Sequence, residues 1–164
     1  MNFIACIDRM GGLGYKGQLL FHLHKDMEYF RKLTEGGVVV MGYRTYRSLP
    51  HGALLNRKNV VLSRNHDVED EDVVLVRDKD ELRLYLETCK EPVWIIGGQS
   101  LYVEFLPECK EIFLTRVDTL RRSDCFFPCP EMLRGWKMVS EEQGEEDGIH
   151  FTFEHYARKT PFCP

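Results

Sequence analysis

Short runs of apolar and β-branched residues recur along the chain, separated by polar segments. Several runs are almost continuous in Val and Ile, which is typical of strands that are buried on both faces of a sheet. The runs predict strands over residues 3–7, 38–41, 59–63, 73–76, 93–96, 112–117, 137–140 and 151–157.

The pattern also predicts four helices between these strands. Apolar side chains recur every three or four residues over residues 23–34 and again over residues 82–89. The second segment follows Asp78-x-x-Glu81, which is typical of a capping box. Two shorter helices, each followed by a proline, are expected over residues 44–49 and 100–106.

The alternation of strands and helices predicts an α/β fold with a mostly parallel central sheet and helices on both faces. The last two strands are separated by a turn-rich stretch, residues 144–148, and are expected to form an antiparallel edge hairpin. Ligands of such sheets bind at the carboxyl ends of the strands. The segments that follow residues 7, 41, 63, 96 and 117 are therefore where chemistry is expected.

Size and charge narrow the class of protein. The chain has 164 residues, enough for one domain with a real core. Lys and Arg total 22 against 26 Asp and Glu, and the resulting net charge of −4 argues against nucleic acid as a partner. No apolar run is long enough to cross a bilayer, and the first residues do not resemble a signal peptide. We therefore expect a cytoplasmic protein with no membrane partner.

The six cysteines show no C-x-x-C spacing, and Cys125 and Cys129 lack a matching second pair. His22 and His24 have no acid or cysteine at ligand spacing beside them. We expect free thiols and no metal site.

Residues 12–17 match G-x-G-x-x-G after a strand, as in a dinucleotide-binding turn. The helical period begins only near Leu23, and the acidic residue that should end the second strand is missing. We interpret this segment as a long flexible loop whose glycines let the backbone move or press against a ligand. A merely flexible surface loop is the alternative.

The segment around Gly97 and Gly98 is a stronger signal, because a buried strand runs through two glycines into a helix. Such a junction exposes backbone N–H groups that can bind a pyrophosphate. Arg44 and Arg64 follow two other strands and could bind the extra phosphate that distinguishes NADP from NAD. The alternative is that both arginines are ordinary surface residues.

Asp26 lies in the first turn of a predicted helix, on the face of Phe30, with Leu23 and Met27 marking the apolar stripe beside it. A carboxylate that faces an apolar pocket needs a partner, such as an amidine-like ring, or takes up a proton at a raised pKa. The alternative is an acid that merely favours the helix dipole.

Taken together, several blocks resemble bacterial dihydrofolate reductase in order and spacing. These blocks are residues 20–30, 39–46, 56–63, 96–107, 114–118 and 124–128. The resemblance implies one domain over residues 1–159, with residues 160–164 as a tail. It also implies a cytoplasmic monomer that reduces 7,8-dihydrofolate with NADPH for one-carbon metabolism and that binds antifolate inhibitors.

The resemblance assigns roles to residues. The implied catalytic set is Asp26, Thr115 and Phe21. Arg57 is expected to bind the glutamate carboxylate, and the Gly97–Gly98 peptide bond to be cis. The implied substrate-binding residues are Ile4, Cys6, Asp26, Met27, Phe30, Leu49, Leu54, Arg57, Ile96, Tyr102 and Thr115. The implied cofactor-binding residues are Cys6, Leu13, Gly14, Gly17, Gln18, Gly42, Arg44, Thr45, Leu62, Ser63, Arg64, Arg77, Ile96, Gly97, Gly98, Gln99, Ser100, Leu101 and Tyr102.

The chain departs from the family pattern at three places. Leu20-Phe21 stands where Pro-Trp is usual, His24-Lys25 replaces a proline before the acid, and Gln99 replaces a third glycine. Two other functions stay open at this point: the related reductase of riboflavin biosynthesis, and a catalytically silent protein that binds folate or nucleotide. The riboflavin enzymes lack the helix acid combined with Arg57, which argues against the first of these.

Overall fold

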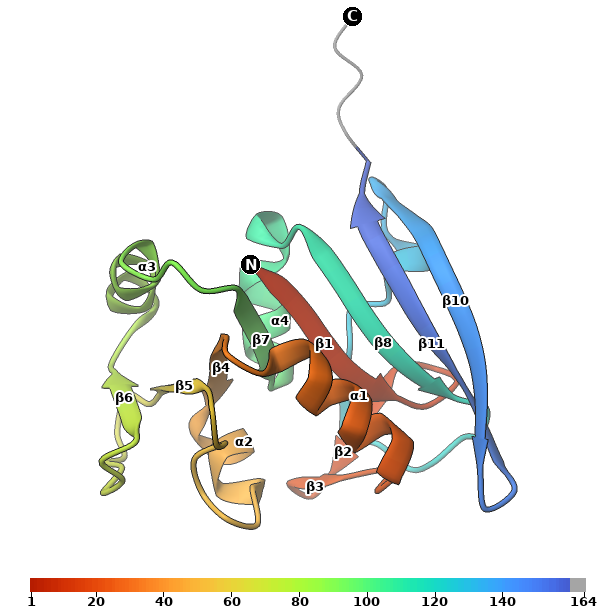
Figure 1. Ribbon diagram of the computed structural model, residues 1–164, viewed down its shortest axis with the longest axis horizontal. Coiled ribbons are helices and arrows are strands. Elements are labelled where there is room, and N and C mark those ends of the chain that lie inside the picture. Colours follow the sequence, from red (N-terminus) through yellow and green to blue (C-terminus); the bar gives the residue numbers. More distant parts are fainter. Residues whose placement is uncertain (160–164) are drawn as a thin grey trace, which may run out of the picture.

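The computed structural model describes residues 1–159, which form a twisted sheet of eight strands in the order β10-β11-β8-β1-β7-β4-β5-β6 (Figure 1). The strands from β8 to β6 run parallel, β11 pairs antiparallel with β8, and β10 pairs antiparallel with β11. The strands are β1 (Asn2–Ile7), β4 (Val38–Gly42), β5 (Lys58–Leu62), β6 (Val73–Val76), β7 (Val93–Gly97), β8 (Glu111–Val117), β10 (Trp136–Glu146) and β11 (Ile149–Arg158).

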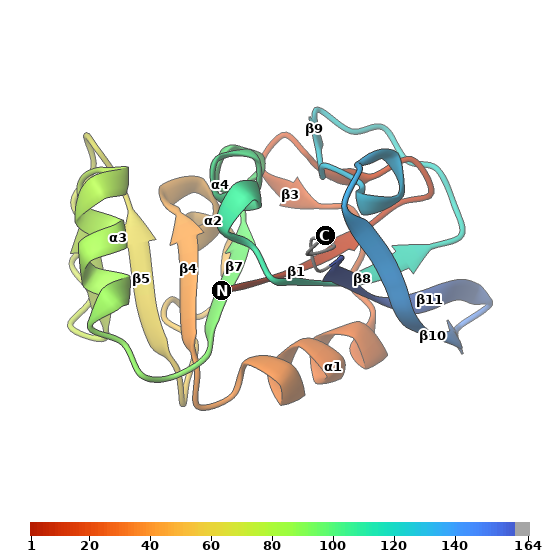
Figure 2. The same ribbon diagram turned by 90° about the horizontal axis from the view of Figure 1, so that it is seen from above.

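Helices cover both faces of this sheet (Figure 2). They are α1 (His24–Thr34), α2 (Tyr43–Ser48), α3 (Lys79–Glu87) and α4 (Gln99–Phe105), with 3₁₀ turns at η1 (Leu106–Glu108) and η2 (Pro130–Met132). The α/β prediction is confirmed.

Strand β4 shows how one run of valines serves both faces. Val38 and Val40 pack in the core beneath α3 and α4, whereas Val39 and Met41 pack in the core beneath α1 and α2. All four side chains are fully buried. The continuous apolar run is therefore explained by alternating side chains that each find a covered face.

The edge hairpin is confirmed, but its predicted bounds were too short. Its turn lies at Asp147–Gly148, so Gly144 is part of β10 rather than of the turn. Most of β10 is exposed on both faces, so it carries no apolar alternation that could have shown its length.

The glycine-rich segment after β1 is not simply a loop. It forms β2 (Gly12–Tyr15) and β3 (Gln18–Leu19), which join β9 (Cys125–Phe126) in a small antiparallel sheet. Asp8, only 2% exposed, accepts hydrogen bonds from the backbone N–H groups of Met10, Gly12 and Arg121 at the base of this sheet. The prediction missed these strands because they are short and because β9, the second partner of β2, comes about 110 residues later in the chain.

The cysteines within residues 1–159 are free thiols, and Cys163 and the predicted tail lie outside the described residues. No helix over residues 1–159 is both long and apolar enough to span a bilayer.

Candidate active site

Asp26 lies in the first turn of α1, on the side that faces the sheet. Its carboxylate faces the Thr115 hydroxyl on β8 and the Cys6 thiol on β1. Cys6 and Thr115 are register partners on adjacent strands, so their side chains lie side by side. One helix and two strands thus place three polar side chains in contact.

Burial raises the pKa of Asp26, and the nearby Glu146 carboxylate adds to the increase. The donor groups of Thr115 and Cys6 lower the pKa of Asp26, because they stabilise the charged form. Burial also raises the pKa of the Cys6 thiol well above its usual range, so the thiol keeps its proton and can donate it. The site therefore holds a carboxyl group that binds a proton more readily than a solvated one.

An apolar wall lies beside Asp26. The side chains that form it belong to one cluster beneath α1 and α2, and the predicted pocket residues in it are Ile4, Phe30, Leu49, Leu54 and Ile96. Met27 does not join this cluster and is 58% exposed, so the prediction that it marks the packed stripe of α1 was wrong. The helix turns Met27 outward while Phe30 and Leu33 pack inward.

Arg57 is held at the far end of this wall, next to Phe30. Its Nε donates to the Leu55 carbonyl at 2.8 Å and its Nη1 donates to Thr34 Oγ1 at 3.1 Å. The guanidinium carbon lies 5.9 Å from the centroid of the Phe30 ring. Nη2 has no hydrogen-bond partner among residues 1–159, so the side chain is oriented and still has donors to offer a ligand.

A second region of the site forms where β4 and β7 end. The Gly97–Gly98 peptide bond is cis, as the resemblance implied. A side chain at Gly42 would meet only the backbone nitrogen of Gly98, at 3.9 Å, and one at Gly97 would meet Thr45 Oγ1 at 3.3 Å. Glycine at these positions keeps open a space between the first turns of α2 and α4.

Tyr102 closes the inner end of this space. Its hydroxyl donates to the Ile4 carbonyl at 2.7 Å, and the ring packs against Phe3 and Phe127. Complete burial raises its pKa above its usual range, so the hydroxyl stays protonated. Leu101 is also buried, and only its backbone can contact a ligand.

The predicted phosphate-binding residues divide into two groups. Arg44 and Arg64 are exposed and form no ion pair or hydrogen bond with another residue of the described chain. Ser63 instead uses its hydroxyl internally, donating to the His66 carbonyl and accepting from the His66 N–H. Arg77, which was predicted to bind another part of the cofactor, is also engaged, through the carbonyls of Ser63 and His66 and an ion pair with Asp67.

The remaining predicted cofactor residues lie around this region. In the small sheet Gly14 pairs with Leu19 and Gln18 pairs with Tyr15, Gly17 lies at the turn with φ +77°, and Leu13 packs against the core. The Gln99 side chain accepts a hydrogen bond from the Phe126 N–H at 2.7 Å, so it links α4 to β9. Leu62 ends β5 and is partly buried, and Ser100 is exposed on α4.

Phe21 is buried with Leu20, Leu23, Val117 and Phe151, and the Arg121 guanidinium lies 4.6 Å from its ring centroid. The ring offers no polar atom at this position.

Two contacts join the segment around residues 121–124 to the segment before α1. Arg121 donates to the Leu20 carbonyl, and Asp124 accepts from the Lys16 N–H at 2.8 Å.

Sequence reasoning missed Asp8, Arg121, Asp124 and Glu146. Arg121, Asp124 and Glu146 contact the site region through groups about 100 or more positions away in the chain, and Asp8 combines one such contact with two local ones. No local motif marks the distant contacts.

Comparisons with known proteins agree with this geometry. The family model described as dihydrofolate reductase matches residues 1–158. The dihydrofolate reductase of Bacillus subtilis (strain 168) is 32% identical over 149 residues, which cover 90% of this chain and 86% of that protein. A bifunctional dihydrofolate reductase-thymidylate synthase of Paramecium tetraurelia is 31% identical over 160 residues, and this chain spans only 34% of its length.

A solved structure, titled dihydrofolate reductase from Enterococcus faecalis complexed with NADP(H) and RAB-propyl, superposes with a TM-score of 0.86. It is 28% identical, and the match covers 97% of this chain and 96% of that one. Fold, site and comparisons together define the class of protein, an α/β oxidoreductase. The chain belongs to the dihydrofolate reductase family.

Proposed function

We propose that this protein catalyses the NADPH-dependent reduction of 7,8-dihydrofolate to 5,6,7,8-tetrahydrofolate. The observation that carries the proposal is the Asp26 carboxyl, which has a raised pKa and lies against Thr115 and Cys6 beside an apolar wall. Family membership over residues 1–158 supports the same reaction.

Asp26 recognises the pterin ring and supports its protonation. A carboxylate accepts two parallel hydrogen bonds from a 2-amino group and an adjacent ring N–H, which matches an amidine-like edge. Thr115 orients the carboxylate and takes part in the same network. Because Asp26 holds a proton more readily than a solvated acid, it assists delivery of a proton to the neighbouring ring nitrogen, through water.

The rest of the substrate binds along the apolar wall. Ile4, Phe30, Leu49, Leu54 and Ile96 exclude water from the flat part of the molecule. Arg57, already oriented by Leu55 and Thr34, binds the glutamate α-carboxylate through its remaining N–H groups.

The residues at the ends of β4 and β7 fit a dinucleotide. The open space next to Gly42, Gly97 and Gly98 admits a pyrophosphate close to backbone N–H groups. Arg44 and Arg64 hold the 2′-phosphate, which NADPH carries and NADH lacks. When bound, NADPH would supply the hydride, and the backbone carbonyls of Cys6 and Ile96, together with Tyr102, would hold its nicotinamide end.

Phe21 and the small sheet of β2, β3 and β9 cover this end of the site and exclude water. Phe21 contributes apolar cover only, since its ring cannot hold a water molecule by a hydrogen bond.

We further propose that the protein binds antifolates, acts as a monomer and works in the cytoplasm. Its free thiols agree with a reducing compartment, and light scattering on a sizing column tests the monomer.

One assay tests the function against its alternatives. The protein is mixed with NADPH and dihydrofolate, and the absorbance of the reduced nicotinamide is followed. Substrate-dependent loss of absorbance is expected. Loss only with a ribosylaminopyrimidine would identify the riboflavin-pathway reductase instead. Binding of both ligands without any loss would identify a silent binding protein.

A further inference from the structure

Helix α1, which carries Asp26, begins without a cap of its own. Its N-cap residue, Leu23, has an apolar side chain and makes no side-chain hydrogen bond to the helix. The first N–H groups of a helix have no partner inside the helix, so they need an acceptor from elsewhere.

Glu146, at the tip of the β10–β11 hairpin, supplies that acceptor. The His24 N–H donates to its Oε2 at 2.7 Å and the Lys25 N–H donates to its Oε1 at 2.8 Å. The Lys25 Nζ also donates to the neighbouring Glu145 carbonyl at 2.8 Å. Three hydrogen bonds therefore join the hairpin tip to the two residues that precede Asp26.

The same hairpin also flanks the other partners of Asp26. Phe153 of β11 is the register partner of Thr115 on β8, and Thr115 is in turn the partner of Cys6 on β1. Tyr29 of α1 packs on the Phe153 ring, with centroids 4.2 Å apart. The hairpin is thus continuous with the strand that binds Asp26 and also holds the helix that carries it.

We propose that Glu146 is a positioning residue for the reduction: its carboxylate fixes the first turn of α1 and thereby places Asp26 against Thr115 and Cys6. The proposal rests on the function proposed above for Asp26. It assigns a role to a residue about 120 positions away in the chain.

The charge of Glu146 acts in addition to its hydrogen bonds. The N–H groups of His24 and Lys25 hold the pKa of Glu146 below its usual range, so it is ionised at neutral pH. A negative charge close to Asp26 disfavours a second one, and Glu146 accordingly raises the pKa of Asp26. The titratable or polar groups around Asp26 are Cys6 of β1, Thr115 of β8, Tyr29 of α1 and Glu146 of β10. Glu146 in turn faces His24 and Lys25 of α1, and Glu142 of β10 lies beside Tyr29.

The test compares Glu146→Gln with Glu145→Gln. Gln at position 146 keeps one acceptor and loses the charge. The control removes the same charge one residue away, where the carboxylate accepts only from the Gly148 N–H of the turn. The pH profile of hydride transfer for Glu146→Gln should move to lower pH, and its rate above the wild-type pKa should fall about two- to five-fold. The Glu145→Gln profile should match wild type. Matching profiles for all three proteins would overturn the proposal.

Two measurements decide the proposal without using activity. Amide exchange at His24 and Lys25 should be about five-fold faster in Glu146→Ala, because both N–H groups lose their acceptor. NMR titration of the Asp26 carboxyl carbon should show a lower pKa in Glu146→Gln than in Glu145→Gln. If wild type proves inactive on dihydrofolate, the proposed function fails, yet these two results still support or overturn the role of Glu146 as a cap. Unchanged exchange together with an unchanged titration would overturn it.

Discussion

The first turns of α1 and α3 meet the same physical need in different ways. In α3 the acceptor is local: the Asp78 side chain accepts from the N–H groups of Asp80 and Glu81, at 2.9 and 2.8 Å. In α1 the acceptor is the distant Glu146. The local cap lies in exposed chain, whereas the distant cap lies next to the carboxyl that we assign to catalysis.

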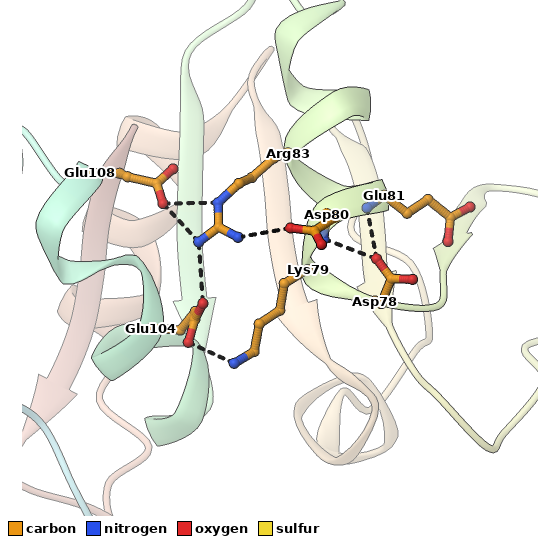
Figure 3. A network of polar contacts seen from close by, with 7 residues as sticks. All are labelled: Asp78, Lys79, Asp80, Glu81, Arg83, Glu104 and Glu108. Atoms are coloured by element: carbon orange, nitrogen blue, oxygen red, sulfur yellow. Dashed lines mark hydrogen bonds and ion pairs between the residues drawn. The ribbon is translucent and has the colours of Figure 1, made fainter.

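The charged side chains of the two helices also differ: those of α3 lie at the surface, whereas the acid in the first turn of α1 faces the sheet. On α3, Arg83 pairs with Glu104 and Glu108 at 3.2 and 2.9 Å, and Lys79 pairs with Glu104 at 2.6 Å (Figure 3). These partly exposed pairs join α3 to α4 and η1, and pairs near the protein surface add little stability each. On α1 the carboxylate of the first turn is turned inward, and burial shifts its pKa. A helix start that serves stability is satisfied locally, and one that serves chemistry is held by another part of the chain.

The largest expected effect comes from removing the inward carboxylate. Asp26→Asn should slow hydride transfer by roughly 10²–10⁴-fold at neutral pH, because the proton is then harder to supply. Its rate should rise steadily on acidification, with no plateau near the wild-type pKa. Asp80→Asn, in the first turn of α3, should leave both rate and profile unchanged. Stopped-flow measurement of hydride transfer from pH 5 to 9 checks this, and a near-wild-type Asp26→Asn rate would place the acid elsewhere.

The second-largest effect is expected on the choice between NADPH and NADH. It comes from removing arginines that have no partner in the part of the chain that the structure describes, and it is compared with removing an arginine that forms ion pairs. Arg44 and Arg64 have no partner among residues 1–159, whereas Arg83 has several carboxylates. Replacing Arg44 and Arg64 together by Ala should lower the ratio of kcat/KM for NADPH to that for NADH by roughly ten-fold or more, since charge-assisted hydrogen bonds to the 2′-phosphate are lost. Arg83→Ala should leave the ratio unchanged. An unchanged ratio in the double variant would contradict the phosphate assignment.

Removing the local cap should affect stability alone. Asp78→Ala leaves the N–H groups of Asp80 and Glu81 without an acceptor and should lower the free energy of unfolding by about 1 kcal/mol. Urea unfolding measures this, with Asp78→Ser as the variant that keeps an acceptor. The pH profile of hydride transfer should stay as in wild type, in contrast to Glu146→Gln. A shifted profile in Asp78→Ala would remove the distinction between the two helix starts.

The sequence showed the α3 cap and missed the α1 cap for a physical reason. The pattern Asp78-x-x-Glu81 lies within one helical turn, although Glu81 accepts from the Arg77 N–H rather than from that of Asp78. Glu146 is one acid among several in an exposed strand, and nothing local distinguishes it. The central strands were predictable because their continuous apolar runs reflect burial on both faces. Strands β2, β3 and β9 were not, because they are only two to four residues long and β2 meets β9 only after the chain returns.

The candidate site residues, too, were predictable only where the signal lies in the local sequence. Asp26 was identifiable because an acid on the apolar face of a helix is unusual. Ser63 and Arg77 were predicted to bind the cofactor, but their polar groups are used within the protein, which only the folded loop around His66 reveals.

The smallest expected effect separates the groups that act on Asp26. The Cys6 thiol stabilises the charged carboxylate and Glu146 destabilises it, so their removal should shift the Asp26 pKa in opposite directions. In Cys6→Ala the pKa of Asp26 should rise, because a donor to the ionised form is lost. The protonated form then persists to higher pH, and the profile of hydride transfer should move upward. A neutral hydrogen bond of this kind corresponds to roughly a five-fold change in protonation equilibrium.

Cys6→Ser keeps a donor and should stay close to wild type. Cys89→Ala removes a thiol near the end of α3 that donates to the Tyr85 carbonyl, and it should leave the profile unchanged. NMR titration of the Asp26 carboxyl gives the same comparison without turnover. A downward shift in Cys6→Ala would mean that opening the site to water outweighs the lost hydrogen bond. The pKa of Asp26 would then be set by burial and by Glu146, and the Cys6 thiol would have no measurable effect on it.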